Sequence, residues 1–82
     1  MPRYRQYVVV HTVRLNGREK YYFPKVNKNN EFQNFSYEIE KDTPIFISYN
    51  KAVEFMNQLK SQKKQSLKIL ILDRDGELKD LP

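Results

Sequence analysis

The chain has 82 residues and no cysteine, and fifteen Lys and Arg against ten Asp and Glu give it a net charge of +5. Hydrophobic residues make up 39% of the chain, which excludes a disordered protein, and the length accommodates one core, so we expect a single domain over residues 1–82. Without cysteine there is no disulfide framework, thiolate metal site or cysteine nucleophile, and we expect a cytoplasmic protein. The longest apolar run, Ile69–Leu72, is far shorter than the roughly 20 residues of a membrane helix, so no membrane association is expected.

The first predicted element is a strand from Arg5 to Leu15, a segment dense in β-branched and aromatic residues with no helical period. Asn16-Gly17 follows, and this pair favours the positive φ angles of a type I′ turn. We therefore expect a hairpin whose second strand runs from Arg18 to Val26. Pro24 cannot donate to a ladder, so the end of this second strand is predicted to be an outer or bulged position.

A third strand is predicted after an exposed connection at residues 28–31, which contain no apolar residue. From Phe35 to Lys41 apolar and polar residues alternate, and this is the clearest strand pattern in the sequence. Its apolar members, Phe35, Tyr37 and Ile39, are expected to face the core. The segment 42–44 is expected to end the strand.

The only predicted helix begins after Ser48, whose hydroxyl makes it the expected N-cap. Apolar residues recur three and four positions apart from Ala52 to Leu59, with polar residues on the other side, so the helix is amphipathic and is expected to end near Lys64 or Gln65. Residues 67–72 are predicted to form a strand buried on both faces, and Asp75-Gly76 a second hairpin turn.

The predicted order of elements is β-β-β-α-β, with a short last strand after Gly76 as a further element. This order favours an α+β fold, in which one antiparallel sheet of four to five strands carries one amphipathic helix packed on one face. Because a single helix covers only one face, we expect the other face to be solvated or to bind a partner.

Positive charge is concentrated in two segments of the chain. Residues 1–30 hold seven Lys and Arg against one Glu, and residues 48–68 hold five Lys against one Glu. Aromatic residues lie between the bases of the first segment, and exposed rings stack on unpaired bases while flanking cations bind phosphates. The predicted nucleic-acid-binding residues are Arg3, Arg5, Tyr7, Arg14, Arg18, Lys20, Tyr22, Lys25, Lys63 and Lys64. The alternative interpretation is that the lysines complement the helix dipole and that the rings form cross-strand pairs in the core.

Asp73-Arg74-Asp75-Gly76, after the apolar run Ile69–Leu72, resembles the first motif of haloacid-dehalogenase-type phosphatases, in which the first Asp is the nucleophile and the second a general acid. In that family the Mg²⁺ ligands and a lysine come much later in the chain. Only six residues follow Gly76 in this sequence, so we interpret the segment as a hairpin turn. In element order alone, the three strands and helix are similar to DNA-binding domains of some integrases and plant transcription factors, which lay strands in the major groove.

No constellation of catalytic residues is recognisable. His11, the only histidine, has no marked orienting partner or nucleophile and is predicted to be structural, so we expect no enzymatic activity, no cofactor and no metal. The leading hypothesis is a small basic accessory protein that binds nucleic acid of unspecified strandedness. The alternative is a protein-interaction module, such as a small regulator or inhibitor of phage-like origin, that docks on a larger acidic protein. A homodimer formed through an edge strand is the third hypothesis.

Overall fold

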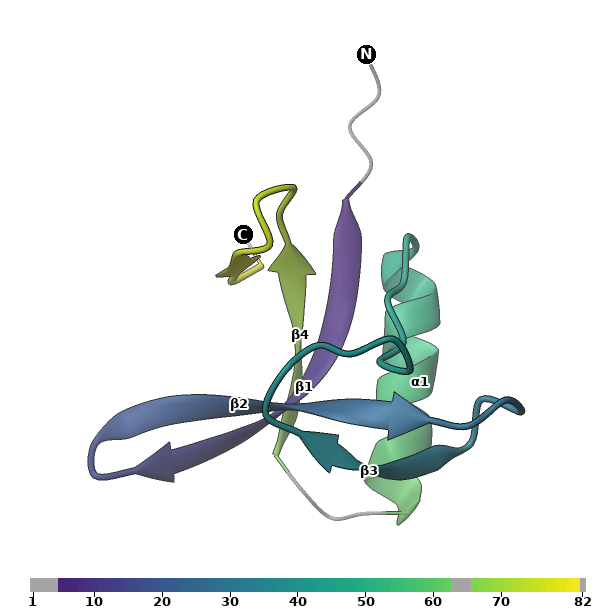
Figure 1. Ribbon diagram of the computed structural model, residues 1–82, viewed down its shortest axis with the longest axis horizontal. Coiled ribbons are helices and arrows are strands. Elements are labelled where there is room, and N and C mark those ends of the chain that lie inside the picture. Colours follow the sequence, from purple (N-terminus) through teal and green to yellow (C-terminus); the bar gives the residue numbers. More distant parts are fainter. Residues whose placement is uncertain (1–4, 63–65, 82) are drawn as a thin grey trace.

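The computed structural model describes residues 5–62 and 66–81 (Figure 1). The elements are β1 (Gln6–Leu15), β2 (Arg18–Val26), β3 (Phe32–Ser36), α1 (Tyr49–Gln62), β4 (Leu67–Leu72) and β5 (Leu78–Lys79). The strands form one antiparallel sheet in the order β3-β2-β1-β4-β5, and α1 packs against β1 and β4. The predicted α+β fold is confirmed, and the short last strand is present. In the described part of the chain, no helix is long and apolar enough to cross a membrane.

The first hairpin has the predicted turn, and its bounds are as predicted except that β1 begins at Gln6 and not at Arg5. Asn16 and Gly17 have φ angles of 52° and 78°, as a type I′ turn requires, and Leu15 lies opposite Arg18 in the ladder. The predicted irregularity near Pro24 is also found, because the register between β2 and β3 shifts between Lys25 and Val26. The ladder between β1 and β2 reaches only to Tyr22, so at Pro24 the strand β2 pairs on one side only, with β3.

Strand β1 changes partners at His11. Its first half, Gln6 to His11, pairs with β4, and its second half, His11 to Leu15, pairs with β2. On the edge of the first half that faces away from β4, Tyr7 and Phe46 exchange backbone hydrogen bonds of 2.7 and 2.8 Å. Residues 12–22 therefore form a two-stranded ribbon that projects from the rest of the sheet, at the left of Figure 1. We call this segment the ribbon.

Both faces of the first half of β1 are covered. On the helix side, Val9 packs in a cluster with Ala52, Leu59 and Ile69. On the other side, Val8 and Val10 are 0% exposed, because β2, the segment before α1 and β5 fold over them. That second cluster contains Val8, Val10, Phe23 and Leu70, with Tyr21, Ile45 and Leu78 packed against it. The expectation that the second face is left to solvent or to a partner is therefore wrong for this part of the sheet.

The third strand differs from its prediction. It runs from Phe32 to Ser36, and the residues expected to face the core after it are exposed, Tyr37 to 81% and Ile39 to 37%. Local hydrogen bonds turn the chain here, since the Glu40 N–H donates to Thr43 Oγ1 at 2.9 Å and the Thr43 N–H donates back to the Glu40 backbone carbonyl at 3.0 Å. These bonds replace the ladder that a longer strand would need.

The helix and the second hairpin turn follow the sequence pattern. Helix α1 begins at Tyr49, directly after Ser48, whose carbonyl accepts the N–H of Ala52 at 3.2 Å. The predicted helix end at Lys64 or Gln65 lies outside the described residues. In the turn between β4 and β5, Gly76 has a φ of 81° and its N–H donates to the Asp73 carbonyl at 2.9 Å.

Candidate nucleic-acid interface

The register of the ribbon decides which side chains share a face. Directly opposed residues of an antiparallel pair point to the same side, and alternate residues of one strand do too. Lys20 lies opposite Val13, and Arg18 lies opposite Leu15. Arg14 lies opposite Glu19 and therefore points to the other side. Of the predicted cations on the ribbon, Arg18 and Lys20 thus share one face, whereas Arg14 lies on the reverse.

The face that carries Arg18 and Lys20 continues into a row of aromatic rings. His11 lies opposite Tyr22 in the ladder, and their ring centroids are 6.2 Å apart. The Tyr22 ring is 5.5 Å from the Tyr37 ring, and the His11 ring is 5.1 Å from the Phe35 ring. Phe35 is in turn 4.9 Å from Phe32, which packs against the helix-side core. This ring row, made of these five residues, leads from the core to the open surface.

His11 is fixed in this row by the backbone. Its Nδ1 lies 3.0 Å from the carbonyl oxygen of Ser66, and because a carbonyl only accepts, Nδ1 donates the proton. The Thr12 N–H donates to the same oxygen at 3.0 Å. Ser66 therefore ties the base of the ribbon to the start of β4 and sets the orientation of the imidazole.

The two faces of the ribbon differ in charge. Arg18 and Lys20 are exposed and take no part in any ion pair among the described residues. On the reverse, Glu19 lies 3.5 Å from Lys68, which also reaches Asp80 at 3.3 Å and stands 5.1 Å from the Tyr21 ring centroid. Desolvation alone would lower the pKa of Lys68, but its hydrogen bonds with Asp80 and Tyr21 outweigh that effect and raise it. Acidic partners thus offset the charge of Lys68 on the reverse, where Arg14 is also in no ion pair among the described residues, while the ring-row face carries both Arg18 and Lys20.

The remaining predicted binding residues lie elsewhere. Tyr7 packs against the helix-side cluster, and its ring also meets the half-exposed Tyr49 ring edge-on at 5.7 Å, so it already has a packing role. Lys25 lies 2.7 Å from Glu40 and 3.7 Å from Asp42, and its hydrogen bond with Glu40 is the main cause that raises its pKa. Arg5 is exposed but precedes β1, at the end of that strand away from the ribbon. Arg3, Lys63 and Lys64 lie outside the described residues.

Tyr37 is a candidate site residue that the sequence pattern misassigned. Its alternation with Phe35 and Ile39 predicts a core position, but the ring lies 81% exposed at the outer end of the ring row. The signal that marks the true strand end is the pair of hydroxyl side chains, Ser36 and Thr43, that accept hydrogen bonds from the local backbone. Such residues compete with a ladder and favour turns.

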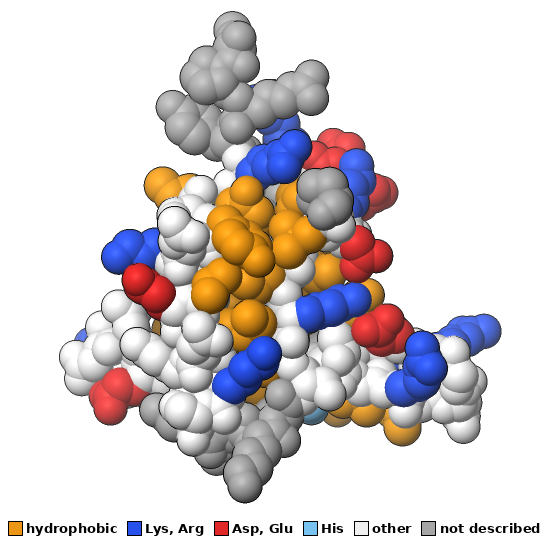
Figure 2. All heavy atoms as spheres, turned by 180° about the vertical axis from the view of Figure 1, so that it is seen from behind, with side chains coloured by type: hydrophobic (Ala, Val, Ile, Leu, Met, Phe, Trp, Pro, Cys, Tyr) orange, Lys and Arg blue, Asp and Glu red, His pale blue; other side chains and the backbone are white. Residues whose placement is uncertain are grey.

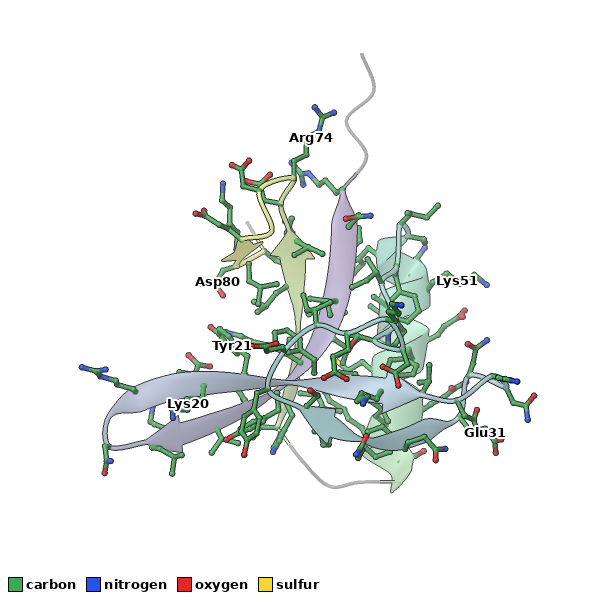
Figure 3. The ribbon with its side chains drawn as sticks, viewed as in Figure 1. Lys20, Tyr21, Glu31, Lys51, Arg74 and Asp80 are labelled. Atoms are coloured by element: carbon green, nitrogen blue, oxygen red, sulfur yellow. The ribbon has the colours of Figure 1, made fainter. Side chains whose placement is uncertain are left out.

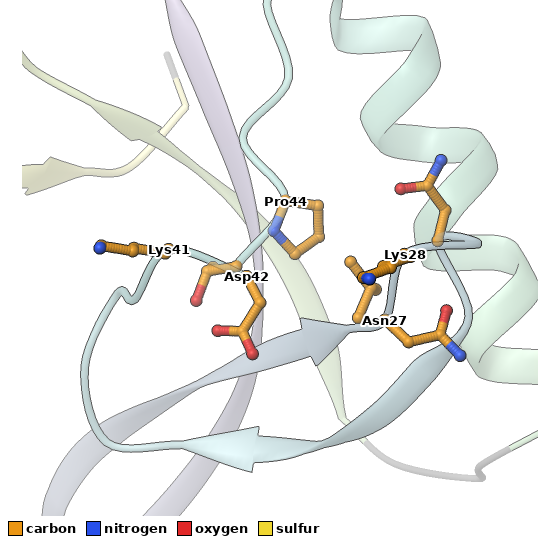
Figure 4. A pocket seen from close by; sticks show the side chains of 8 residues that line it. Asn27, Lys28, Lys41, Asp42 and Pro44 are labelled. Carbon is orange, nitrogen blue, oxygen red and sulfur yellow. The ribbon is translucent and has the colours of Figure 1, made fainter.

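A hollow of about 570 Å³ lies away from the ribbon, beside the turn after β2 (Figure 4). Its lining mixes Lys28 and Lys41 with Asp42, so no single charge predominates. Among the described residues, no three His, Asp or Glu side chains lie close enough together to hold a metal ion. The hollow therefore has neither a lining of one charge nor a metal-binding cluster among the described residues, and the ribbon is the stronger candidate site.

Comparison of the chain with protein-family models, with curated proteins and with solved structures finds no match.

Proposed function

We propose that this protein is a small, non-enzymatic, basic nucleic-acid-binding accessory protein of the cytoplasm and that the ribbon is its contact surface. The observation that carries the proposal is the pairing of Arg18 and Lys20 on one exposed face with the ring row beside them. A cation that has no carboxylate partner is available to a phosphate, and binding then releases the counterions of the nucleic acid.

The spacing of the cations suits a phosphate backbone. Arg18 and Lys20 are two residues apart on β2, which places them about 7 Å apart along one face. Arginine binds a phosphate through two parallel N–H donors, whereas lysine acts as a compact point charge. Arg14, on the reverse of the same thin ribbon, adds to the positive potential without facing the same ligand.

The test is fluorescence anisotropy of the full chain with labelled single-stranded DNA, duplex DNA and RNA. We expect binding that weakens steeply between about 50 and 200 mM salt, because phosphate contacts lose most affinity over that range. Exchange of both ribbon cations, Arg18→Gln with Lys20→Gln, should lower the slope of log affinity against log salt by about 1.4 to 1.8, the share of two phosphate contacts.

A matched control removes the same charge elsewhere. Lys28 lies in the turn after β2, and Lys51 lies on α1, on the side of the molecule opposite Lys20 in Figure 3. Exchange of both for Gln should leave the salt slope nearly unchanged. Equal losses in the two double variants would show that bulk charge, and not the ribbon, binds. Absence of salt-sensitive binding to all three nucleic acids would overturn the proposal.

The predicted contacts of Lys63 and Lys64 with phosphates are tested in the same assay by exchanging both for Glu. We expect lower affinity and a flatter salt slope with the fold intact. An unchanged slope would remove these two residues from the binding surface and leave the ribbon as the proposed site.

A second candidate function, docking on an acidic protein, is favoured by two observations. Hydrophobic side chains gather in the middle of the face seen in Figure 2, with charges of both signs around them, as at many protein interfaces. The edge of the ribbon at Val13 to Leu15 has no neighbouring strand on its outer side among the described residues, and such an edge accepts a partner strand.

These observations carry less weight than the ribbon's cationic face. The large hydrophobic residues that are most open to solvent do not belong to the helix-side cluster, which is the group of side chains packed around Val9 and Ala52. They are Leu15, Tyr37, Ile39, Ile47 and Tyr49. Pairing of two copies through the ribbon edge would bring like charges of Arg14, Arg18 and Lys20 together, which disfavours the homodimer. Sedimentation of the chain alone tests the homodimer, and we expect a monomer near 9.9 kDa.

A further inference from the structure

We infer that the preferred ligand is single-stranded nucleic acid, whose bases stack on Tyr37 and Tyr22 while Arg18 and Lys20 hold its backbone. This inference rests on the proposed function and adds to it the class of ligand. It follows from the position of the rings, because charge alone would serve single strands and duplexes alike.

The outer end of the ring row offers an open aromatic surface. Tyr37 is 81% exposed, yet its ring stands only 5.5 Å from that of Tyr22 at an interplanar angle of 51°. The next ring along, that of His11, is held by the Ser66 carbonyl, and the row ends in the core at Phe32. The inner rings, those of Phe32, Phe35 and His11, therefore lie between the core and the two outer tyrosines. Tyr37 has a free face in contact with water.

An open aromatic face is useful to a ligand with unpaired bases. In a single strand, each base exposes a π-face that stacks on a tyrosine ring, whereas the bases of a duplex are already stacked on one another. A ribbon that reads duplex DNA in the major groove depends instead on polar side chains that reach base edges. Here the residues opposite the two cations on this face are Val13 and Leu15, which have no hydrogen-bonding groups in their side chains.

The charge on this face matches that ligand. Lys20 precedes Tyr22 by two positions on the same side of β2, and Arg18 precedes Lys20 by two more. A strand whose bases stack at Tyr37 and Tyr22 would therefore run its phosphates along the ribbon towards the Asn16-Gly17 turn. The reverse face, where Glu19, Lys68 and Asp80 form ion pairs, carries Arg14 but lacks an exposed ring row among the described residues.

The test compares oligothymidylate, oligouridylate and a duplex DNA of equal length in the anisotropy assay. We expect either single strand to bind more tightly than the duplex at the same salt. Tyr37→Ala should weaken single-strand binding by between about fivefold and a hundredfold, the range for loss of one stacked base. Tyr37→Phe keeps the ring and should restore most of the affinity, and both variants should bind the duplex as the parent chain does.

Ile47→Ala is the matched control, because Ile47 is 74% exposed and lies outside the ribbon and the ring row. It should leave single-strand affinity unchanged. Since the chain contains no tryptophan, its intrinsic fluorescence comes from tyrosine, and quenching by oligouridylate should shrink in Tyr37→Ala. Melting temperatures of the variants confirm that each is folded.

Two outcomes would separate failure of this inference from failure of the proposed function. Tighter binding of the duplex, or a Tyr37→Ala variant that binds single strands like the parent chain, would overturn the inference while salt-sensitive binding through Arg18 and Lys20 still supported the function. Absence of salt-sensitive binding to every probe would overturn both.

Discussion

The two halves of β1 have similar residues and different surroundings. Val8, Val9 and Val10 in the first half are 0% exposed, whereas Leu15 in the second half is 47% exposed and Val13 is half-buried. Both halves are rich in β-branched residues, so intrinsic strand propensity does not distinguish them. We call residues 6–11 the anchor and compare it with the ribbon.

The neighbours of each half account for the difference. The anchor has β4 on one edge and the Tyr7–Phe46 bridge on the other, with α1 over one face and Ile45 over the opposite face. Among the described residues, the ribbon half of β1 from Val13 to Leu15 pairs with no strand other than its hairpin partner β2. Elements that come later in the chain therefore decide which half of a strand becomes core and which half is left to contact a ligand.

The largest expected effect comes from one substitution made in each half. Val9→Ala removes two methyl groups from a fully buried site and should lower the free energy of unfolding by about 2 to 3 kcal/mol, including the cavity left behind. Val13→Ala in the ribbon should cost less than about 1 kcal/mol. Urea unfolding of both variants measures the difference, and equal losses would show that the ribbon is as buried as the anchor.

Local patterns in the sequence predicted most of the fold. The bounds of β2, the start of α1, the strand at 67–72 and both glycine turns are where the sequence places them. Each depends on residues that are close together in the chain, such as Asn16 with Gly17 or Ser48 with the first helical turn. Propensity and turn chemistry act over that range.

The third strand shows where local pattern fails. Period-two alternation from Phe35 to Lys41 predicts a strand whichever partner is available, but β3 pairs only with Phe23 to Val26 and stops at Ser36. Beyond that point, the hydrogen bonds between Glu40 and Thr43 form in place of the ladder bonds of a longer strand.

Sequence reasoning identified cations of the candidate site but not their arrangement. Whether Arg14 shares a face with Arg18 depends on the register set by the turn, and register assigns them to opposite faces. Lys25 is engaged by Glu40, fifteen positions away in the chain, and no local pattern predicts that pair. The exposure of Tyr37, on which the stacking inference depends, is likewise a consequence of where β3 ends.

An intermediate effect is expected at the ribbon's turn. Gly17 has a φ of 78° and open space where a Cβ would lie, so Gly17→Ala is strained by backbone conformation alone and should cost about 1 to 2 kcal/mol. Gly17→Asn should cost less, because asparagine tolerates this region better.

Hydrogen exchange shows where that cost appears. If the ribbon is less stable than the anchor, amides from Val13 to Lys20 should exchange faster in Gly17→Ala, while those of Val8 to Val10 keep the rate of global unfolding. Equal acceleration at all of these amides would mean that the two halves open together, and that the ribbon is no less stable than the anchor.

The smallest expected effect is at Asp73, in the exposed turn that joins β4 to β5 beside the anchor. Two hydrogen bonds lower the pKa of Asp73 below its usual 3.8. The larger effect comes from Lys79, which lies 2.8 Å from the carboxylate, and the second from the Arg74 N–H, which donates to it at 2.7 Å. A carboxylate that is more acidic in the folded chain adds stability above the unfolded pKa and loses that contribution as the pH falls through the folded pKa. Asp73→Asn should therefore melt slightly below the parent chain at neutral pH, and the two melting temperatures should converge near about pH 2. A gap that stays constant across this range would assign the loss to turn geometry and not to charge. If the two melting temperatures also converge at high salt, the source is the ion pair between Lys79 and Asp73, whose side chains are 59% and 34% exposed.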